Sequence, residues 1–258
     1  MTTLQLFAGA SGYSYKPWKG PFYPKDLPDP EMLSFYAERL PTVEINNTFY
    51  RLPKAAVLEE WAARTPPTFR FVLKASRKIT HIHRLKDVGE MTDYLFRTAD
   101  TLGPKLGPIL FQLPPFLKKD LDRLRRFCDG VPRERAIAFE FRDQSWLDDD
   151  VFEVLRGHDA ALCVADTEAA PAEDNRQTVA TASWGYLRLR RDDYGDADLM
   201  RWLARIRAQP WSQAYVFFKH ENEGAAPRLA QRLMGLASAK EPARPGGAGV
   251  ASGGDERH

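Results

Sequence analysis

Short apolar runs recur along the chain at intervals of about 30 residues, which is the length of one βαβ unit. The runs are rich in Val, Ile, Leu and Phe, as buried strands are. They predict eight strands, at residues 4–9, 42–47, 69–74, 107–113, 136–141, 161–166, 185–190 and 214–219.

The segments between these runs have apolar residues spaced by three and four, the period of an amphipathic helix. The clearest is residues 29–40, which begins with an acid and a proline and carries one apolar stripe. Further helices are predicted at residues 87–103, 120–130, 196–210 and 226–237. Strands that alternate with helices form a parallel sheet, and eight such units close most economically as a (β/α)8 barrel of the TIM type, an α/β fold. An open doubly wound sheet is the alternative.

The barrel is predicted to span residues 1–237 as one domain, because no change of composition marks a linker within them. Residues 238–258 are rich in Gly, Ala and Pro and have no apolar period. These last residues are therefore predicted to be a disordered tail.

The charge of the chain is nearly balanced, with 37 Lys and Arg against 35 Asp and Glu and a net charge of +2. This balance does not favour non-specific binding to nucleic acid or to a membrane surface. A signal peptide and a membrane-spanning run are both absent from the sequence, so a cytoplasmic protein is expected. Cys128 and Cys163 lack metal or redox spacing and are interpreted as inert core thiols. The sequence does not indicate an oligomeric state.

Polar or charged residues end every one of the eight predicted strands. In (β/α)8 barrels the chemistry lies at the carboxyl ends of the strands and on the loops that follow them. The candidate catalytic residues at these positions are Glu44, Lys74, Glu140 and Asp166. The candidate ligand-binding residues are Tyr15, Trp18, Asn46, Tyr50, Arg51, Gln112, Arg142, Trp146, Arg188, Lys219 and His220.

Charged residues also occur two apart on single strands, as with Glu140 and Arg142. Side chains two apart share a face of a strand, so such pairs predict a polar floor under a pocket if that face points inward. The competing interpretation is an ion-pair network that only fills the barrel interior.

The charged residues suggest how a ligand could be bound and which reactions could be catalysed on it. Arginine offers paired donors to a phosphate or carboxylate, and a desolvated Lys74 could be a base or a Schiff-base nucleophile. Glu44 and Glu140 could divide acid and base work between them if their pKa values differ. On this hypothesis Glu140→Gln would abolish turnover with little loss of fold. Trp18, Tyr50 and Trp146 could offer flat faces to a sugar ring or a base.

Six motifs together resemble a known family: "GASGYSYKPWKGPFYP", "YAERLPTVEINNTFYRLP", "FRFVLKASRKITH", "LGPILFQLPPFL", "AFEFRDQSW" and "FFKHENEGAAP". They are similar to the YecE-like family, domain of unknown function seventy-two, over roughly residues 6–237. The resemblance implies a one-domain TIM barrel but no reaction. Every candidate residue named above except Lys219 and His220 falls on a motif position that the resemblance carries over.

A divalent metal is a further possibility, since Glu44, Glu140, Asp166 and His220 are ligand types on four strand ends. Lys74 and Arg142 count against it, because they would already neutralise the carboxylates. His81 and His83 have the spacing of a metal pair but fall in a basic loop, residues 76–86, and are interpreted as surface histidines. That loop is also a candidate phosphate or nucleic-acid contact.

One function and two alternatives follow from these residues. The first is an enzyme that acts by general acid and base chemistry on a small anionic or phosphorylated, sugar- or nucleotide-like substrate, without a cofactor. The alternatives are a non-catalytic binding protein for an anionic metabolite or nucleic acid, and a divalent-metal-dependent hydrolase or isomerase.

Overall fold

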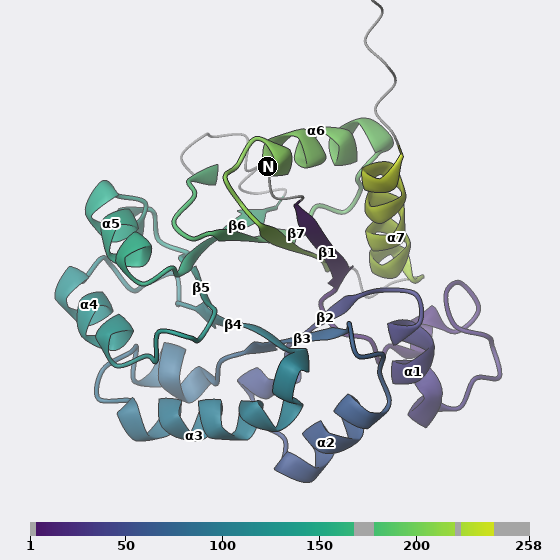
Figure 1. The fold of residues 1–258 in the computed structure, drawn as a ribbon, viewed down its shortest axis with the longest axis horizontal. Helices are drawn as coiled ribbons and strands as arrows, with labels where there is room; N and C mark the ends of the chain where they lie inside the picture. The colour runs from purple at the N-terminus through teal and green to yellow at the C-terminus, as the bar shows by residue number, and fades with distance from the viewer. Residues whose placement is uncertain (1–3, 168–177, 220–222, 240–258) are drawn as a thin grey trace, which may run out of the picture.

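Eight parallel strands close into a barrel in the computed structural model, which describes residues 4–167, 178–219 and 223–239 (Figure 1). The strands are β1 Gln5–Ala10, β2 Thr42–Ile45, β3 Arg70–Lys74, β4 Leu106–Gln112, β5 Ile137–Glu140, β6 Ala161–Asp166, β7 Trp184–Leu189 and β8 Gln213–Phe218. Each strand is hydrogen-bonded to the next, and β8 returns to β1 over six paired residues. The predicted TIM-type barrel is thus confirmed, and the open sheet is excluded because β1 and β8 are paired.

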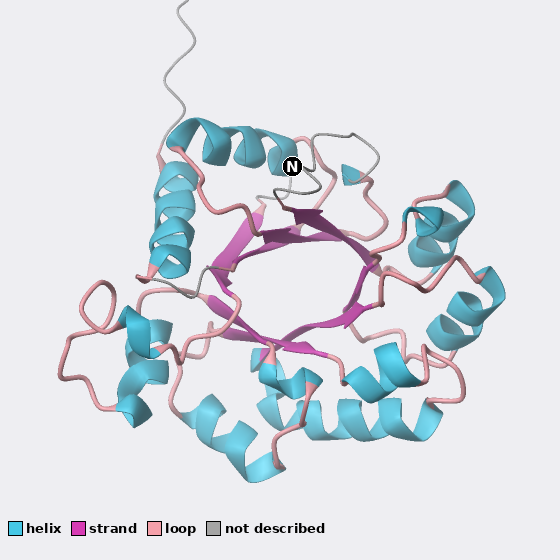
Figure 2. Ribbon diagram, turned by 180° about the vertical axis from the view of Figure 1, so that it is seen from behind, coloured by secondary structure: helices cyan, strands magenta, loops and turns pink. Residues whose placement is uncertain are grey.

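The described helices form a ring outside the barrel (Figure 2). They are α1 Met32–Ala37, α2 Ala55–Ala63, α3 Gly89–Ala99, α4 Leu121–Asp129, α5 Asp149–Gly157, α6 Asp196–Arg207 and α7 Ala225–Ser238. Neither α2 nor α5 was among the predicted segments. Helix α2 buries Leu58 alone, so its apolar stripe is weak in the sequence.

The core has two layers, one inside the barrel and one between the sheet and the helices. The inner layer consists of Phe7, Val72, Leu110, Ala138, Ala161, Cys163, Trp184, Tyr186, Tyr215 and Phe217. Strand β1 approaches β2 closely at Gly9, where a Cβ atom would lie 2.1 Å from the carbonyl oxygen of Thr42. Only glycine fits this position without a backbone shift.

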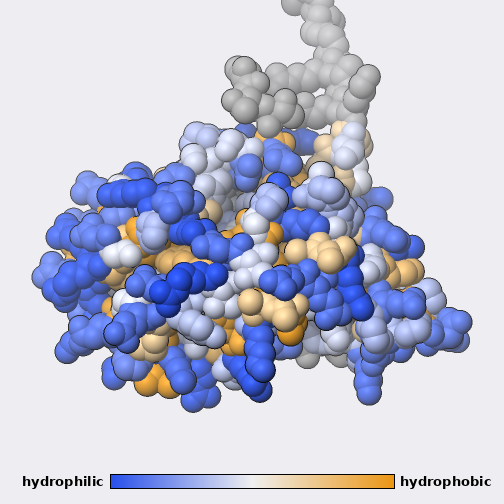
Figure 3. All heavy atoms as spheres, turned by 60° about the horizontal axis from the view of Figure 1, so that its bottom comes forward, coloured by the Kyte–Doolittle hydropathy of each residue, from blue (hydrophilic) through white to orange (hydrophobic). Residues whose placement is uncertain are grey.

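The described part of the chain has no helix both long and apolar enough to cross a membrane. The face in Figure 3 is mostly hydrophilic, with hydrophobic residues in several separate spots. Helix α7 ends at Ser238, and the predicted disordered tail lies outside the described residues from 240 onward.

Candidate active site

Polar side chains fill the carboxyl end of the barrel interior because the strands alternate. Every second side chain of a strand points to the same face. The inward apolar residues on β3, β4, β5 and β7 are each followed, two positions later, by a polar residue that is buried. These polar residues are Lys74, Gln112, Glu140 and Arg188.

Arg188 bridges the two glutamates at the centre of this layer. Its guanidinium donates to Glu44 Oε1 at 2.8 Å and to Glu140 Oε2 at 2.6 Å, and all three side chains are buried. Burial is the largest influence and alone would raise the pKa of both carboxyls, but the charge of Arg188 and the hydrogen bonds to each carboxylate, with the charge of Arg190 at Glu140, together hold both pKa values below their usual range. The pKa of Arg188 is correspondingly well above its usual value: burial would lower it, but the two carboxylates raise it further. The two glutamates are therefore both ionised and do not separate into an acid and a base.

Three further donors occupy Glu44. The hydroxyls of Tyr186 and Ser11 donate to it at 2.6 and 2.8 Å, and the Asn46 amide donates at 3.1 Å. With Arg188 as a fourth partner, the carboxylate is fully bound and buried. Glu44 therefore supports the floor of the site and is not placed to contact a ligand.

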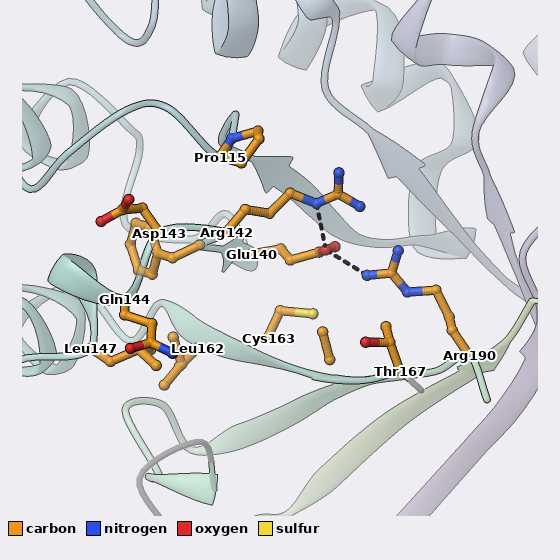
Figure 4. A pocket seen from close by; sticks show the side chains of 12 residues that line it. Pro115, Glu140, Arg142, Asp143, Gln144, Leu147, Leu162, Cys163, Thr167 and Arg190 are labelled. Carbon is orange, nitrogen blue, oxygen red and sulfur yellow. Dashed lines mark hydrogen bonds and ion pairs between the residues drawn. The ribbon is translucent and has the colours of Figure 1, made fainter. Parts of the chain in front are cut away.

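Glu140 lies at the edge of a pocket of about 330 Å³, between two more arginines. Arg190 donates to Glu140 Oε1 at 2.5 Å, and Arg142 Nε lies 3.5 Å from the same oxygen. The two guanidinium groups point toward one another across Glu140, and Cys163 faces the same space (Figure 4). The side chain of Arg142 is 42% exposed, so its remaining N–H groups can reach a bound molecule.

Lys74 occupies the other side of this layer, with 9% of its surface exposed. Its Nζ donates to Gln112 Oε1 at 2.9 Å and lies 4.2 Å from the centre of the Phe49 ring. Burial is the largest influence and lowers the pKa of Lys74 to about 8, helped by the charges of Arg188 and Arg142 and opposed by the two glutamates. Its backbone is fixed, because its N–H donates to the Thr48 hydroxyl at 3.1 Å.

His81 is a site residue that the sequence interpretation missed. It is half-buried and packs edge-on against Phe49, with ring centres 4.9 Å apart, on the ring that also faces Lys74. Burial lowers the pKa of His81, and the charges of Lys74 and Arg142 lower it further. Its position after the third predicted strand was the available signal. His83, by contrast, is exposed.

Asp166 is buried in a separate group and does not join Glu44 and Glu140. It accepts from Arg191 Nε at 2.8 Å and from the Tyr194 hydroxyl at 2.9 Å. Both partners lie in the loop that follows β7. Asp166 thus anchors that loop, and the catalytic role suggested by the sequence has no support from this geometry.

The two tryptophans suggested for stacking are fully buried away from the pocket. The indole of Trp146 stacks on Phe141 and donates to the carbonyl of Leu117 at 2.7 Å. Trp18 packs among aromatic residues that include Tyr15, whose hydroxyl donates to the carbonyl of Ser11.

The remaining candidates lie farther out. Tyr50 is 72% exposed and, with Arg51, lines a separate groove of about 580 Å³ that also includes Lys78 and Tyr94. Lys219 is exposed just beyond β8, and His220 lies outside the described residues. Within the described ranges, no group of three or more His, Cys, Asp or Glu side chains could hold a metal ion.

Comparisons with known proteins agree on one family. The model described as "Protein of unknown function DUF72" matches residues 7–248. The UPF0759 protein YunF of Bacillus subtilis is 30% identical over 139 residues, 51% of this chain and 49% of that protein. The UPF0759 protein YecE of Escherichia coli K12 is 32% identical over 111 residues, 43% of this chain and 41% of that protein. The chain spans about half the length of the curated relatives it matches.

Solved structures share the barrel. A DUF72 family protein of Thermotoga maritima has a TM-score of 0.80 and 24% identity, covering 91% of this chain and 100% of that one. A DUF72 family protein of Enterococcus faecalis has a TM-score of 0.73 and 17% identity, covering 92% and 97%. A xylose isomerase-like TIM barrel fused to a 4-hydroxyphenylpyruvate dioxygenase has a TM-score of 0.52 and 13% identity, covering 90% and 41%. At these identities the likeness shows the fold alone.

Proposed function

This chain belongs to the DUF72 family of proteins of unknown function, and we propose that it is an enzyme acting on a small anionic substrate. In this proposal Arg142 and Arg190 bind the negative charge of the substrate, and Lys74 transfers a proton. The pocket lies at the carboxyl ends of the strands, where barrel enzymes carry their active sites. A phosphorylated sugar or nucleotide as substrate and a cytoplasmic location both stay predictions from the sequence.

The observation that carries the proposal is a surplus of positive charge at the pocket. Three guanidinium groups, those of Arg142, Arg188 and Arg190, meet the two carboxylates of Glu44 and Glu140. Arg188 lies between the carboxylates of Glu44 and Glu140. Asp143, the other carboxylate of the pocket lining, is paired with Lys118 at 2.8 Å, so the surplus falls on the two arginines that line the pocket. Guanidinium donors match a carboxylate or phosphate in pairs, and an anion would balance the charge.

Lys74 is the group best suited to proton transfer. With a pKa of about 8 it is neutral in about a tenth of the molecules at pH 7, whereas an ordinary lysine is neutral in fewer than about one in a thousand. A neutral amine near a bound substrate can accept a proton from it. Glu44 and Glu140, both held ionised, would act through their charge and not as the acid and base pair suggested by the sequence.

A non-catalytic binding protein for an anionic metabolite is the second candidate. It is favoured by the same ion pairs, because both glutamates are consumed by structural contacts. The two candidates share the arginines and differ in whether the bound molecule changes. Turnover therefore decides between them.

The test is a thermal-shift screen with oxalate, inorganic phosphate and glucose 6-phosphate, followed by NMR of any anion that binds. An anion at one hundred times its Kd should stabilise the protein by about 2.7 kcal/mol, a rise in Tm of roughly 5–10 °C. Arg142→Ala should lose most of that rise, while Arg125→Ala, on the exposed face of α4, should keep it. An anion that binds Arg142→Ala as tightly as the wild type would contradict the proposed site. Binding without chemical change across organic acids and phosphates would favour the second candidate.

A further inference from the structure

Two lysines of the described residues have a lowered pKa, and they differ in how their amines are bound. The Nζ of Lys105 donates to the carbonyls of Ala62 and Thr65 and to the Thr65 hydroxyl, so its N–H groups are all used. Within the described part of the chain, the Nζ of Lys74 donates to the Gln112 side chain alone and lies over the Phe49 ring. Once neutral, the Lys74 amine keeps a hydrogen bond that orients it and a lone pair that can react.

The charges around Lys74 suit a nucleophile. Lysines become nucleophilic when they are desolvated or placed next to another cation. Burial and the charges of Arg188 and Arg142 both act on Lys74 in this sense. The opposing carboxylates of Glu44 and Glu140 are partly offset by Arg188, which binds both.

The amine and the arginine pocket are connected through Gln112. Its side-chain oxygen accepts from Lys74, and its amide favours the ionised form of Glu140, the residue beside it on β5. Adjacent strands lie about 4.8 Å apart, so Lys74 on β3 and Glu140 on β5 are about 10 Å apart across the barrel mouth. Arg142 acts on both groups, because it contacts Glu140 and its charge lowers the pKa of Lys74. A molecule of a few carbon atoms could bind the arginine by one end and the lysine by the other.

We propose that Lys74 forms an imine with a small aldehyde or ketone that carries a carboxylate or phosphate, with Arg142 and Arg190 holding the anionic group. This deepens the proposed function and rests on its anion site. The neutral Nζ attacks the carbonyl carbon and forms the C–N bond of a carbinolamine. Both Nζ protons pass to the former carbonyl oxygen, the C–O bond breaks, and one water leaves. No oxidant, reductant or co-reactant is needed.

The test is reductive trapping of the full chain with sodium cyanoborohydride at pH 7, followed by peptide mapping. The probes are glyoxylate, glyceraldehyde 3-phosphate and the neutral acetaldehyde. Lys74 should be labelled by an anionic probe at least about tenfold faster than exposed lysines such as Lys78, because more of its amine is neutral. Whichever anionic probe labels faster identifies the carboxylate or the phosphate class.

Single substitutions separate the contributions of Lys74, Arg142 and Gln112 to the labelling rate. Lys74→Arg should lose the adduct at this peptide, whereas Lys78→Arg should keep it. Arg142→Ala should slow labelling by the anionic probes severalfold more than labelling by acetaldehyde, which should fall only as far as the lost Arg142 charge raises the pKa of Lys74. Gln112→Leu removes the acceptor that orients Nζ and should also slow labelling. If Lys74→Arg does not fold, the wild type tests the same assignment, because bound oxalate should protect Lys74 from labelling by the anionic probes. Labelling of Lys74 at the same rate with and without oxalate would contradict the assignment.

The result that overturns the imine is labelling of Lys74 no faster than that of exposed lysines. If oxalate still stabilises the wild type but not Arg142→Ala, the anion site and the proposed function survive that result. If oxalate and phosphate fail to stabilise the protein as well, both proposals fall together.

Discussion

Replacing Glu140 by Gln should destabilise the fold, because this carboxylate is the counter-ion of two largely buried arginines. It accepts from Arg188 at 2.6 Å and from Arg190 at 2.5 Å, and these three side chains are at most 12% exposed. A glutamine keeps one acceptor oxygen but carries no charge. Arg188 would then retain Glu44 alone, and Arg190 would have no carboxylate partner among the described residues.

The expected loss is large. Removing one partner of a buried ion pair costs about 3–5 kcal/mol, since the other partner stays buried and uncompensated. Domains unfold with about 5–15 kcal/mol, so the variant should still fold at 25 °C but with a much lower urea midpoint. The sequence alone had suggested little loss of fold for this substitution. The buried ion pairs of Glu140 predict a large loss of stability instead.

Urea unfolding at pH 7, followed by circular dichroism and tryptophan fluorescence, measures the effect. Glu60→Gln is the control, because Glu60 pairs with Arg64 at 2.9 Å on an exposed face of α2, where such a pair is worth about 0–1 kcal/mol. Adding Arg190→Met to Glu140→Gln removes one unpaired charge and should recover part of the loss. A Glu140→Gln variant within 1 kcal/mol of the wild type, with the same denaturant slope, would refute this reasoning.

Three further outcomes are expected. The pKa values of Glu44 and Glu140 are lower in the folded protein than in the unfolded chain. Their contribution to the free energy of unfolding is therefore fully present above the unfolded pKa of about 4.3 and is lost as the pH falls through the lower folded values. Urea midpoints that stay unchanged between pH 6 and 3 would contradict this. Gly9→Ala should cost about 1–3 kcal/mol because its Cβ would meet a carbonyl oxygen at 2.1 Å, whereas Gly157→Ala, with open space around it, should be nearly neutral in the same unfolding assay. Burial raises the pKa of Cys163 well above its usual value, so iodoacetamide should leave this pocket thiol unmodified in the native protein at pH 7.5, and rapid alkylation would show that the thiol is accessible and ionises there.

The barrel could be predicted because its signal is local. Each strand is a short apolar run, and the helices between them keep a three-to-four period, as α3 does by burying Thr92, Leu95, Phe96 and Ala99. The position of Lys74, Gln112, Glu140 and Arg188 at strand ends followed from the same pattern together with the general rule for barrels. Helix α2 was not predicted, because it buries only Leu58 and so has a weak apolar stripe.

The partners of the site residues could not be predicted, because they are set by contacts between distant segments. Arg188 is separated from Glu44 by 144 positions, and no spacing rule relates them. Trp146 falls beside the site in sequence, yet its ring turns into the core to bind the carbonyl of Leu117. His81 is half-buried because a π-helix at Lys78–Ile82 turns it toward Phe49. The partners and orientations of these side chains cannot be predicted from their neighbours in the sequence.

The buried charges at the barrel mouth have opposing effects on the pKa of Lys74. Two carboxylates alone at the base of the pocket would raise the pKa of Lys74 and keep it protonated. Arg188 offsets part of their charge, and burial, the largest influence, together with Arg188 and Arg142 lowers the pKa of Lys74 to about 8. Replacing the whole network by apolar residues would avoid the desolvation cost but would also remove the cations that help to lower the pKa of the amine. An ion-pair network that only filled space does not account for a desolvated lysine whose pKa is lowered further by the charge of an exposed arginine. That arrangement is why we interpret the barrel mouth as a reactive site and not as packing.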